Sequence, residues 1–121
     1  MVFDFLQQHP FARHGLIALV NDSCALGALD AVREAAREHH VAIVGQDCIS
    51  EALEEMKNTD TPLIGSVSHG TPLYGPNLIR LGLEMLRGKT VAPYNYVSHR
   101  LVTRGIDSSM DMRERTGPKR E

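Results

Sequence analysis

Three short apolar runs alternate with amphipathic stretches along the first 70 residues. The runs at 15–20, 41–44 and 63–67 have the length and character of buried strands. Between the first two, apolar residues recur at helical spacing among charged ones, which predicts a helix over about 23–38, and Ser50 can begin a shorter helix before the third. Short apolar strands joined by helices are typical of an α/β fold, so we expect a three-layer parallel sheet with crossover helices on both faces.

The rest of the chain predicts a strongly apolar helix, a final strand and a tail. Pro76 suits the first turn of a helix and Gly88 suits its end, which predicts a helix over 76–87. Its polar residues form one stripe, and apolar residues cover most of its circumference, so this helix requires a partner layer. Alternating character predicts a strand over 94–103, and the mixed-charge segment 104–121 should be poorly ordered.

Composition narrows the class of protein. The 121 residues include 13 basic and 15 acidic ones, and a net charge of −2 gives no electrostatic reason to expect nucleic-acid binding. The start lacks a basic leader, and no run approaches the roughly 20 apolar residues of a membrane span, so the chain as written should be soluble and unexported. Cys24 and Cys48 lack the spacing of a zinc site or a disulfide framework, and we expect free thiols.

Polar residues follow each of the three predicted strands. Asn21 and Asp22 follow the first, Gln46 and Asp47 the second, and His69 the third. The carboxyl ends of parallel strands form the ligand edge of such a sheet, so topology should bring these residues together. Each also has a structural interpretation: Asn21 and Asp22 can cap a helix, Asp47 can shape a turn, and His69 can be a solvated loop residue.

Several of these segments resemble a known family. Two segments resemble paired signatures of type I periplasmic sugar-binding proteins and LacI-type regulators. The first is 20–35, in which an Asn-Asp pair is followed by Ala-Leu-Gly-Ala-Leu, and the second is 41–47, which ends in Val-Gly-Gln-Asp. Four more segments resemble the C-terminal section of substrate-binding proteins of sugar ABC transporters: 62–67, 74–81, 86–89 and 99–103. The resemblance implies that residues 1–103 are the C-terminal part of that fold and lack its N-terminal lobe and export signal.

The resemblance also implies a sugar site. It places Asn21 and Asp47 in hydrogen bonds to sugar hydroxyls and His69 at a contact position near the hinge. Gln46 stands where relatives often carry an aromatic residue that stacks on the sugar, and none of the six aromatic residues directly follows one of the three strands. A carboxylate can accept two hydroxyl donors and an amide offers a donor and an acceptor, which suits a neutral polyol.

Two binding functions follow from the resemblance. The first is part of a periplasmic solute receptor that delivers a sugar to an ABC permease. The alternative is the effector-binding part of a cytoplasmic LacI-type regulator, which would explain the missing export signal. The segment 99–103 favours the receptor. The helix over 76–87 would cross back to the first lobe in a full-length receptor, or it would pair with a second copy in a homodimer.

An enzyme has little support in the sequence. Cys48, His69 and Asp47 could form a nucleophilic constellation, and the four histidines after residue 38 could hold a metal. No nucleophile elbow, phosphate loop or His-Glu-x-x-His spacing accompanies them. We therefore expect no catalytic residue, no cofactor and no metal.

Overall fold

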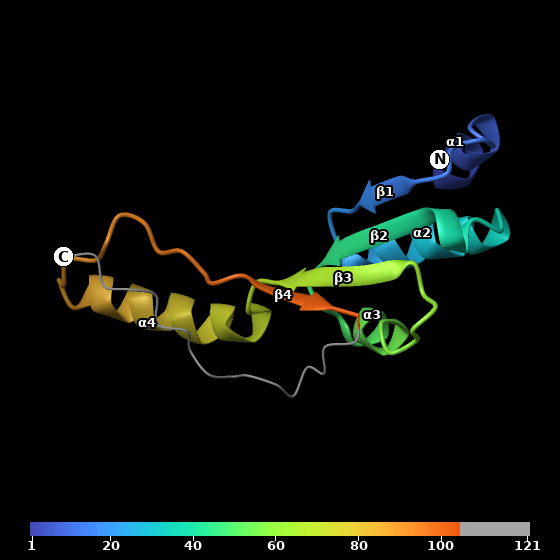
Figure 1. The fold of residues 1–121 in the computed structure, drawn as a ribbon. Helices are drawn as coiled ribbons and strands as arrows, with labels where there is room; N and C mark the ends of the chain where they lie inside the picture. The colour runs from blue at the N-terminus through green and yellow to red at the C-terminus, as the bar shows by residue number, and fades with distance from the viewer. Residues whose placement is uncertain (105–121) are drawn as a thin grey trace, which may run out of the picture.

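A four-stranded sheet is the centre of the computed structural model, which describes residues 1–104 (Figure 1). The strands lie in the order β1-β2-β3-β4. The first three are parallel to one another, and β4 is antiparallel to β3. Their bounds are Gly15–Ala18 for β1, Val41–Gln46 for β2, Leu63–Ser68 for β3 and Arg100–Thr103 for β4.

Three helices pack beside this sheet. The crossover helices are α2 (Asp22–Glu34), which contacts β2 and β3, and α3 (Ser50–Glu55), which contacts β3. The first helix, α1 (Val2–Gln8), packs against α2. Right-handed crossovers that step in the same direction across a sheet put their helices on the same face, and here β1, β2 and β3 follow one another in space as in sequence.

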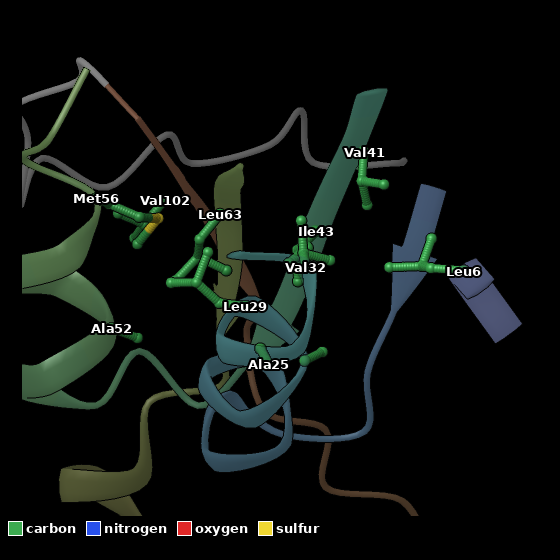
Figure 2. Close-up of a cluster of buried hydrophobic side chains, with 11 residues drawn as sticks. Leu6, Ala25, Leu29, Val32, Val41, Ile43, Ala52, Met56, Leu63 and Val102 are labelled. Carbon is green, nitrogen blue, oxygen red and sulfur yellow. The ribbon is translucent and has the colours of Figure 1, made fainter. Parts of the chain in front are cut away.

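The core lies between one face of the sheet and these helices. Along β2 the burial alternates, so Val41 and Ile43 face the helices and are buried, while Ala42 and Val44 face the other way. Figure 2 shows Ile43 and Leu63 of the sheet meeting Leu29 and Val32 of α2. The full buried apolar set draws on α1, α2, α3 and three strands: Leu6, Ala25, Ala28, Leu29, Val32, Val41, Ile43, Ala52, Met56, Leu63 and Val102.

The opposite face of the sheet differs from the prediction. The α/β class with crossover helices is confirmed, but the core-forming helices of residues 1–104 lie on one face, so the described chain has two layers instead of three. Leu16 of β1 is consequently 71% exposed and Leu101 of β4 is 65% exposed. The order of the strands explains this, since a helix reaches the second face only where the strand order reverses.

The helix α4 (Tyr74–Leu86) projects away from the sheet, and the chain returns from it to β4 (Figure 1). None of its residues is buried, and Leu86 is 86% exposed. Within residues 1–104 its apolar surface is therefore uncovered, and the partner layer that the sequence predicts for this helix is not among these residues. The helix begins two residues before Pro76, directly after a 3₁₀ turn (η2, Thr71–Leu73). It ends at Leu86, one residue before the predicted end, and Gly88 follows with a φ of +72°, as suits a glycine after a helix.

Other predicted boundaries shift as well. The helix α2 ends at Glu34 instead of about residue 38, because Ala36 has a φ of +53° and a 3₁₀ turn (η1, Glu38–His40) follows. The last strand covers only 100–103 of the predicted 94–103. Arg104 belongs to the folded part, since its N–H donates to the Ile64 carbonyl over 3.0 Å. The rest of the predicted tail, 105–121, lies outside the described residues.

The helices of residues 1–104 fall short of the length and apolar character that a membrane-spanning helix requires.

The exposed apolar surface of α4 predicts self-association of the isolated chain, because patches of more than a few hundred Å² on soluble proteins usually mark interfaces. Analytical ultracentrifugation should show a concentration-dependent dimer or higher species. Ile79→Glu should shift the distribution towards monomer, whereas Asn77→Glu, which adds the same charge at an exposed polar position of this helix, should leave it unchanged. A wild-type chain that stays monomeric at all concentrations would contradict the prediction.

Candidate ligand-binding site

The four candidate residues lie at the same edge of the sheet. Asn21 follows β1, Gln46 is the last residue of β2, Asp47 follows it, and His69 follows β3. Since β1, β2 and β3 are parallel and adjacent, these positions share the carboxyl edge. The predicted placement is confirmed, and ligand contact by these residues stays a prediction.

A buried carboxylate holds this edge together. Asp22, in the first turn of α2, is fully buried. Its Oδ1 accepts a hydrogen bond from the Ser66 hydroxyl of β3 over 2.7 Å, and its Oδ2 accepts one from the Ile49 N–H over 3.0 Å. The Ser66 oxygen also accepts from the Cys48 N–H over 3.2 Å. One side chain therefore links the start of α2 to β3 and to the loop after β2.

Gly45 makes room for that carboxylate. A Cβ atom at this position of β2 would lie 2.2 Å from the Asp22 Oδ1 and 3.1 Å from the Ala25 Cβ. Neither neighbour can give way easily, because Asp22 is hydrogen-bonded on both oxygens and Ala25 is buried in the core. The Val-Gly-Gln-Asp sequence thus has a steric reason for its glycine.

The loop after β2 has a backbone that few residues adopt. Asp47 has a φ of +109° and Cys48 a φ of +57°, both in regions that favour glycine. Each such residue costs on the order of 1–3 kcal/mol and persists only where its surroundings fix it. The Asp47 N–H donates to the Val67 carbonyl over 2.9 Å, and Cys48 and Ile49 are held by the Asp22 network. Strain of this kind concentrates at functional sites.

The side chains of Asp47 and Gln46 meet at His69. The His69 Nε2 lies 2.9 Å from the Asp47 Oδ1, and the His69 Nδ1 lies 3.1 Å from the Gln46 Nε2. The His69 side chain is 15% exposed, whereas that of Asp47 is 36% exposed. Among residues 1–104 no hydrogen bond uses the Asp47 Oδ2. The histidine is thus enclosed, and Asp47 keeps an acceptor at the surface.

Asn21 combines the two roles considered for it. It is the N-cap of α2, and its Oδ1 accepts a hydrogen bond from the Cys24 N–H over 2.8 Å. The cap uses only the carbonyl oxygen of the amide. The Nδ2 group, with two N–H donors, is not used by the hydrogen bonds within residues 1–104 and can donate to a ligand.

Two aromatic rings at this edge were not among the predicted residues. The ring of Tyr74 stacks on His69, with centroids 6.0 Å apart and planes at 20°, and the ring of His99 meets His69 edge-on at 6.0 Å. Gly70, with a φ of +66°, and the 3₁₀ turn return the chain so that Tyr74 reaches His69. His99 lies at this edge because β4 is antiparallel to β3, so the residues at the start of β4 lie beside the carboxyl end of β3.

Three hollows on the surface of residues 1–104 are lined by residues other than the four candidates. One of about 530 Å³ is at the amino edge of the sheet, lined in part by His14, His40 and Thr61. Another of about 580 Å³ runs along α4 past Tyr94 and Tyr96. A third of about 540 Å³ lies beside α3 and is lined in part by Ser50, Glu54 and Asn58. None of the three encloses a ligand at the four candidate residues.

The site does not have the properties of a cysteine nucleophile. Burial raises the pKa of the Cys48 thiol above its ordinary value, whereas nucleophilic cysteines need a lowered pKa. Cys24 and Cys48 are both free, as predicted. Within residues 1–104 no group of three or more His, Cys, Asp or Glu side chains is arranged to hold a metal ion.

Comparison with solved structures decides the fold family. The solute-binding protein of an ABC transporter from Agrobacterium vitis, solved with bound allitol, superposes with a TM-score of 0.79 at 25% identity over 86% of this chain and 36% of that one. The Caulobacter myo-inositol binding protein, bound to myo-inositol, gives a TM-score of 0.74 at 25% identity over 86% and 35%. The chain has part of the type I periplasmic-binding-protein fold. An ABC sugar transporter subunit from Rhodobacter sphaeroides gives 0.77 at 23% identity, over 85% and 36%.

These matches confirm the resemblance to solute-binding proteins of sugar ABC transporters. No family model and no curated protein matches the chain. The chain spans about a third of the length of the solved structures, so the periplasmic-binding-protein fold is represented here by one portion.

Gly45→Ala should destabilise the chain, because the added Cβ displaces the Asp22 carboxylate from its two hydrogen bonds. We expect the free energy of unfolding to fall by about 1–3 kcal/mol, as for other overpacked sites. The matched control is Gly27→Ala, an exposed position of α2 with open space around it, which should raise stability by about 0.5–1 kcal/mol. Urea titration followed by circular dichroism measures both, and equal stability of Gly45→Ala and wild type would contradict the steric argument.

Proposed function

We propose that this chain provides one side of the sugar-binding site of a type I solute receptor, as the C-terminal part of that receptor. The observation that carries the proposal is the strained loop at Asp47, which holds a half-exposed carboxylate at the ligand edge of the sheet. The fold supports it, since similar structures were solved with allitol, D-allose and myo-inositol bound.

The chemistry of the edge supports a neutral polyol as the ligand. Asp47 offers an acceptor for a hydroxyl donor, and a hydrogen bond to a charged carboxylate is among the stronger ones. Asn21 offers donors from its Nδ2 to a hydroxyl oxygen. The negative charge of Asp47 opposes a phosphorylated or carboxylated ligand, because like charges repel strongly where water is excluded.

The proposed setting follows from the same relatives. The receptor would act in the periplasm and deliver its sugar to an ABC permease, with residues 1–104 forming part of the receptor fold. The regulator alternative is not favoured, because the matching structures from Agrobacterium vitis, Rhodobacter sphaeroides and Actinobacillus succinogenes are ABC transporter proteins. Catalysis is not part of the proposal.

The open edge and the exposed α4 support a site that is completed by a second lobe. Receptor sites bury most of the ligand surface, and a half-site leaves each hydroxyl contact competing with water. If half the contacts of a micromolar receptor are absent, about 8 kcal/mol of binding free energy falls to about 4, which is the millimolar range.

The isolated chain should therefore bind polyols weakly and locally. In titrations of ¹⁵N-labelled chain with allitol, D-allose and myo-inositol, at least one polyol should shift the amides near Asn21, Asp47 and His69 with a dissociation constant of about 1 mM. Asp47→Ala should abolish the shifts. Asp60→Ala, which removes an exposed carboxylate from the opposite edge, should leave them unchanged.

Two outcomes would overturn this account. Absence of binding to all three polyols, both in the chain and after fusion to the first lobe of a related receptor, would exclude a polyol site. Micromolar binding by the chain alone would mean that one side of the site is sufficient.

A further inference from the structure

We propose that His69 is a positioning residue that sets the direction of the hydrogen bonds which the site offers to its ligand. It does so by binding the amide nitrogen of Gln46, which leaves the carbonyl oxygen of Gln46 and the second oxygen of Asp47 as acceptors for the ligand. This inference rests on the proposed function, because it names the pattern of ligand groups that the same site would select.

The surroundings of His69 favour an indirect role. Its side chain is 15% exposed, Tyr74 stacks on its ring, and His99 contacts it edge-on. Both ring nitrogens already have partners, the Asp47 Oδ1 at 2.9 Å and the Gln46 Nε2 at 3.1 Å. No ring nitrogen is left for a ligand, so His69 acts on the ligand through its two neighbours.

The proton positions in this cluster follow from its chemistry. An ionised carboxylate can only accept hydrogen bonds, so the Asp47 Oδ1 places the imidazole proton on Nε2. In a neutral imidazole the other nitrogen is then an acceptor. The Gln46 group that faces Nδ1 must therefore be the NH₂, as the 3.1 Å contact has it. The Gln46 Oε1 consequently points away from the histidine.

The result is a defined pattern of donors and acceptors. The Gln46 Oε1 and the Asp47 Oδ2 are acceptors from consecutive residues that are bound to one imidazole ring, and the Asn21 Nδ2 is a donor. Each of these two acceptors matches a hydroxyl group of the ligand that donates its proton. The site therefore selects two hydroxyl donors, and a ligand with a methoxy or keto oxygen at either position leaves two acceptors facing each other.

The tautomer of His69 tests this inference without any ligand. Long-range ¹H–¹⁵N correlation spectra of the chain in slightly alkaline buffer should show a protonated Nε2 and an unprotonated Nδ1 for His69. Gln46→Glu replaces the NH₂ donor by an acceptor, so the Nδ1 resonance should move to the position of a protonated nitrogen. The matched control is His99→Gln, which touches only the ring edge and should leave the His69 tautomer unchanged.

A His69 that carries its proton on Nδ1, or that averages between both tautomers, would overturn the inference. So would a Gln46→Glu chain with an unchanged His69 spectrum. The wild-type measurement needs no substitution and so does not depend on a variant folding. Failure of the proposed function is distinguishable, because polyol titrations would then show no binding while the tautomer of His69 stays as stated.

Discussion

The buried carboxylate of Asp22 is the interaction on which the described structure depends. Removing a charge from water is costly unless the charge is hydrogen-bonded, and Asp22 accepts from Ser66 on one oxygen and from Ile49 on the other. These contacts join the start of α2 to β3 and to the loop after β2, which are far apart in the sequence. The absence of a side chain at Gly45 is what lets the carboxylate approach β2.

The Asp22 network explains how the site can hold a strained residue. Asp47 and Cys48 have positive φ angles, and the hydrogen bonds to the following amides fix the loop in that conformation. The loop presents the Asp47 side chain at the carboxyl edge, where His69 binds one of its oxygens and leaves the other at the surface. The buried Asp22 network therefore determines where the free oxygen of Asp47 lies at the carboxyl edge.

Much of the fold could be predicted because burial follows simple periodicities. The apolar runs predicted three strands, and the helical spacing of apolar residues predicted α2. The parallel topology then predicted that four residues share one edge of the sheet: Asn21, Gln46, Asp47 and His69. The sequence indicates Asp22 as a residue of the ligand edge or a helix cap but does not predict its burial, since burial of a carboxylate depends on partners 27 and 44 residues away. Tyr74 and His99 were missed for the same reason. The number of helix layers could not be predicted, because it depends on the order of the strands in the sheet, and the spacing of apolar residues along the chain carries no information about that order.

Hydrogen exchange of single amides tests the role of Asp22 most directly. In the wild-type chain the Ile49 and Cys48 amides should exchange as slowly as amides in the middle of β2. In Asp22→Ala both should exchange about tenfold faster or more, because the Ile49 N–H loses its acceptor and the Ser66 hydroxyl loses the partner that fixes it, and a lost hydrogen bond of this kind costs about 1–3 kcal/mol locally. Asp30→Ala, at an exposed position of α2, should change neither amide. Rapid exchange at Ile49 in the wild-type chain, or no change in Asp22→Ala, would contradict the account.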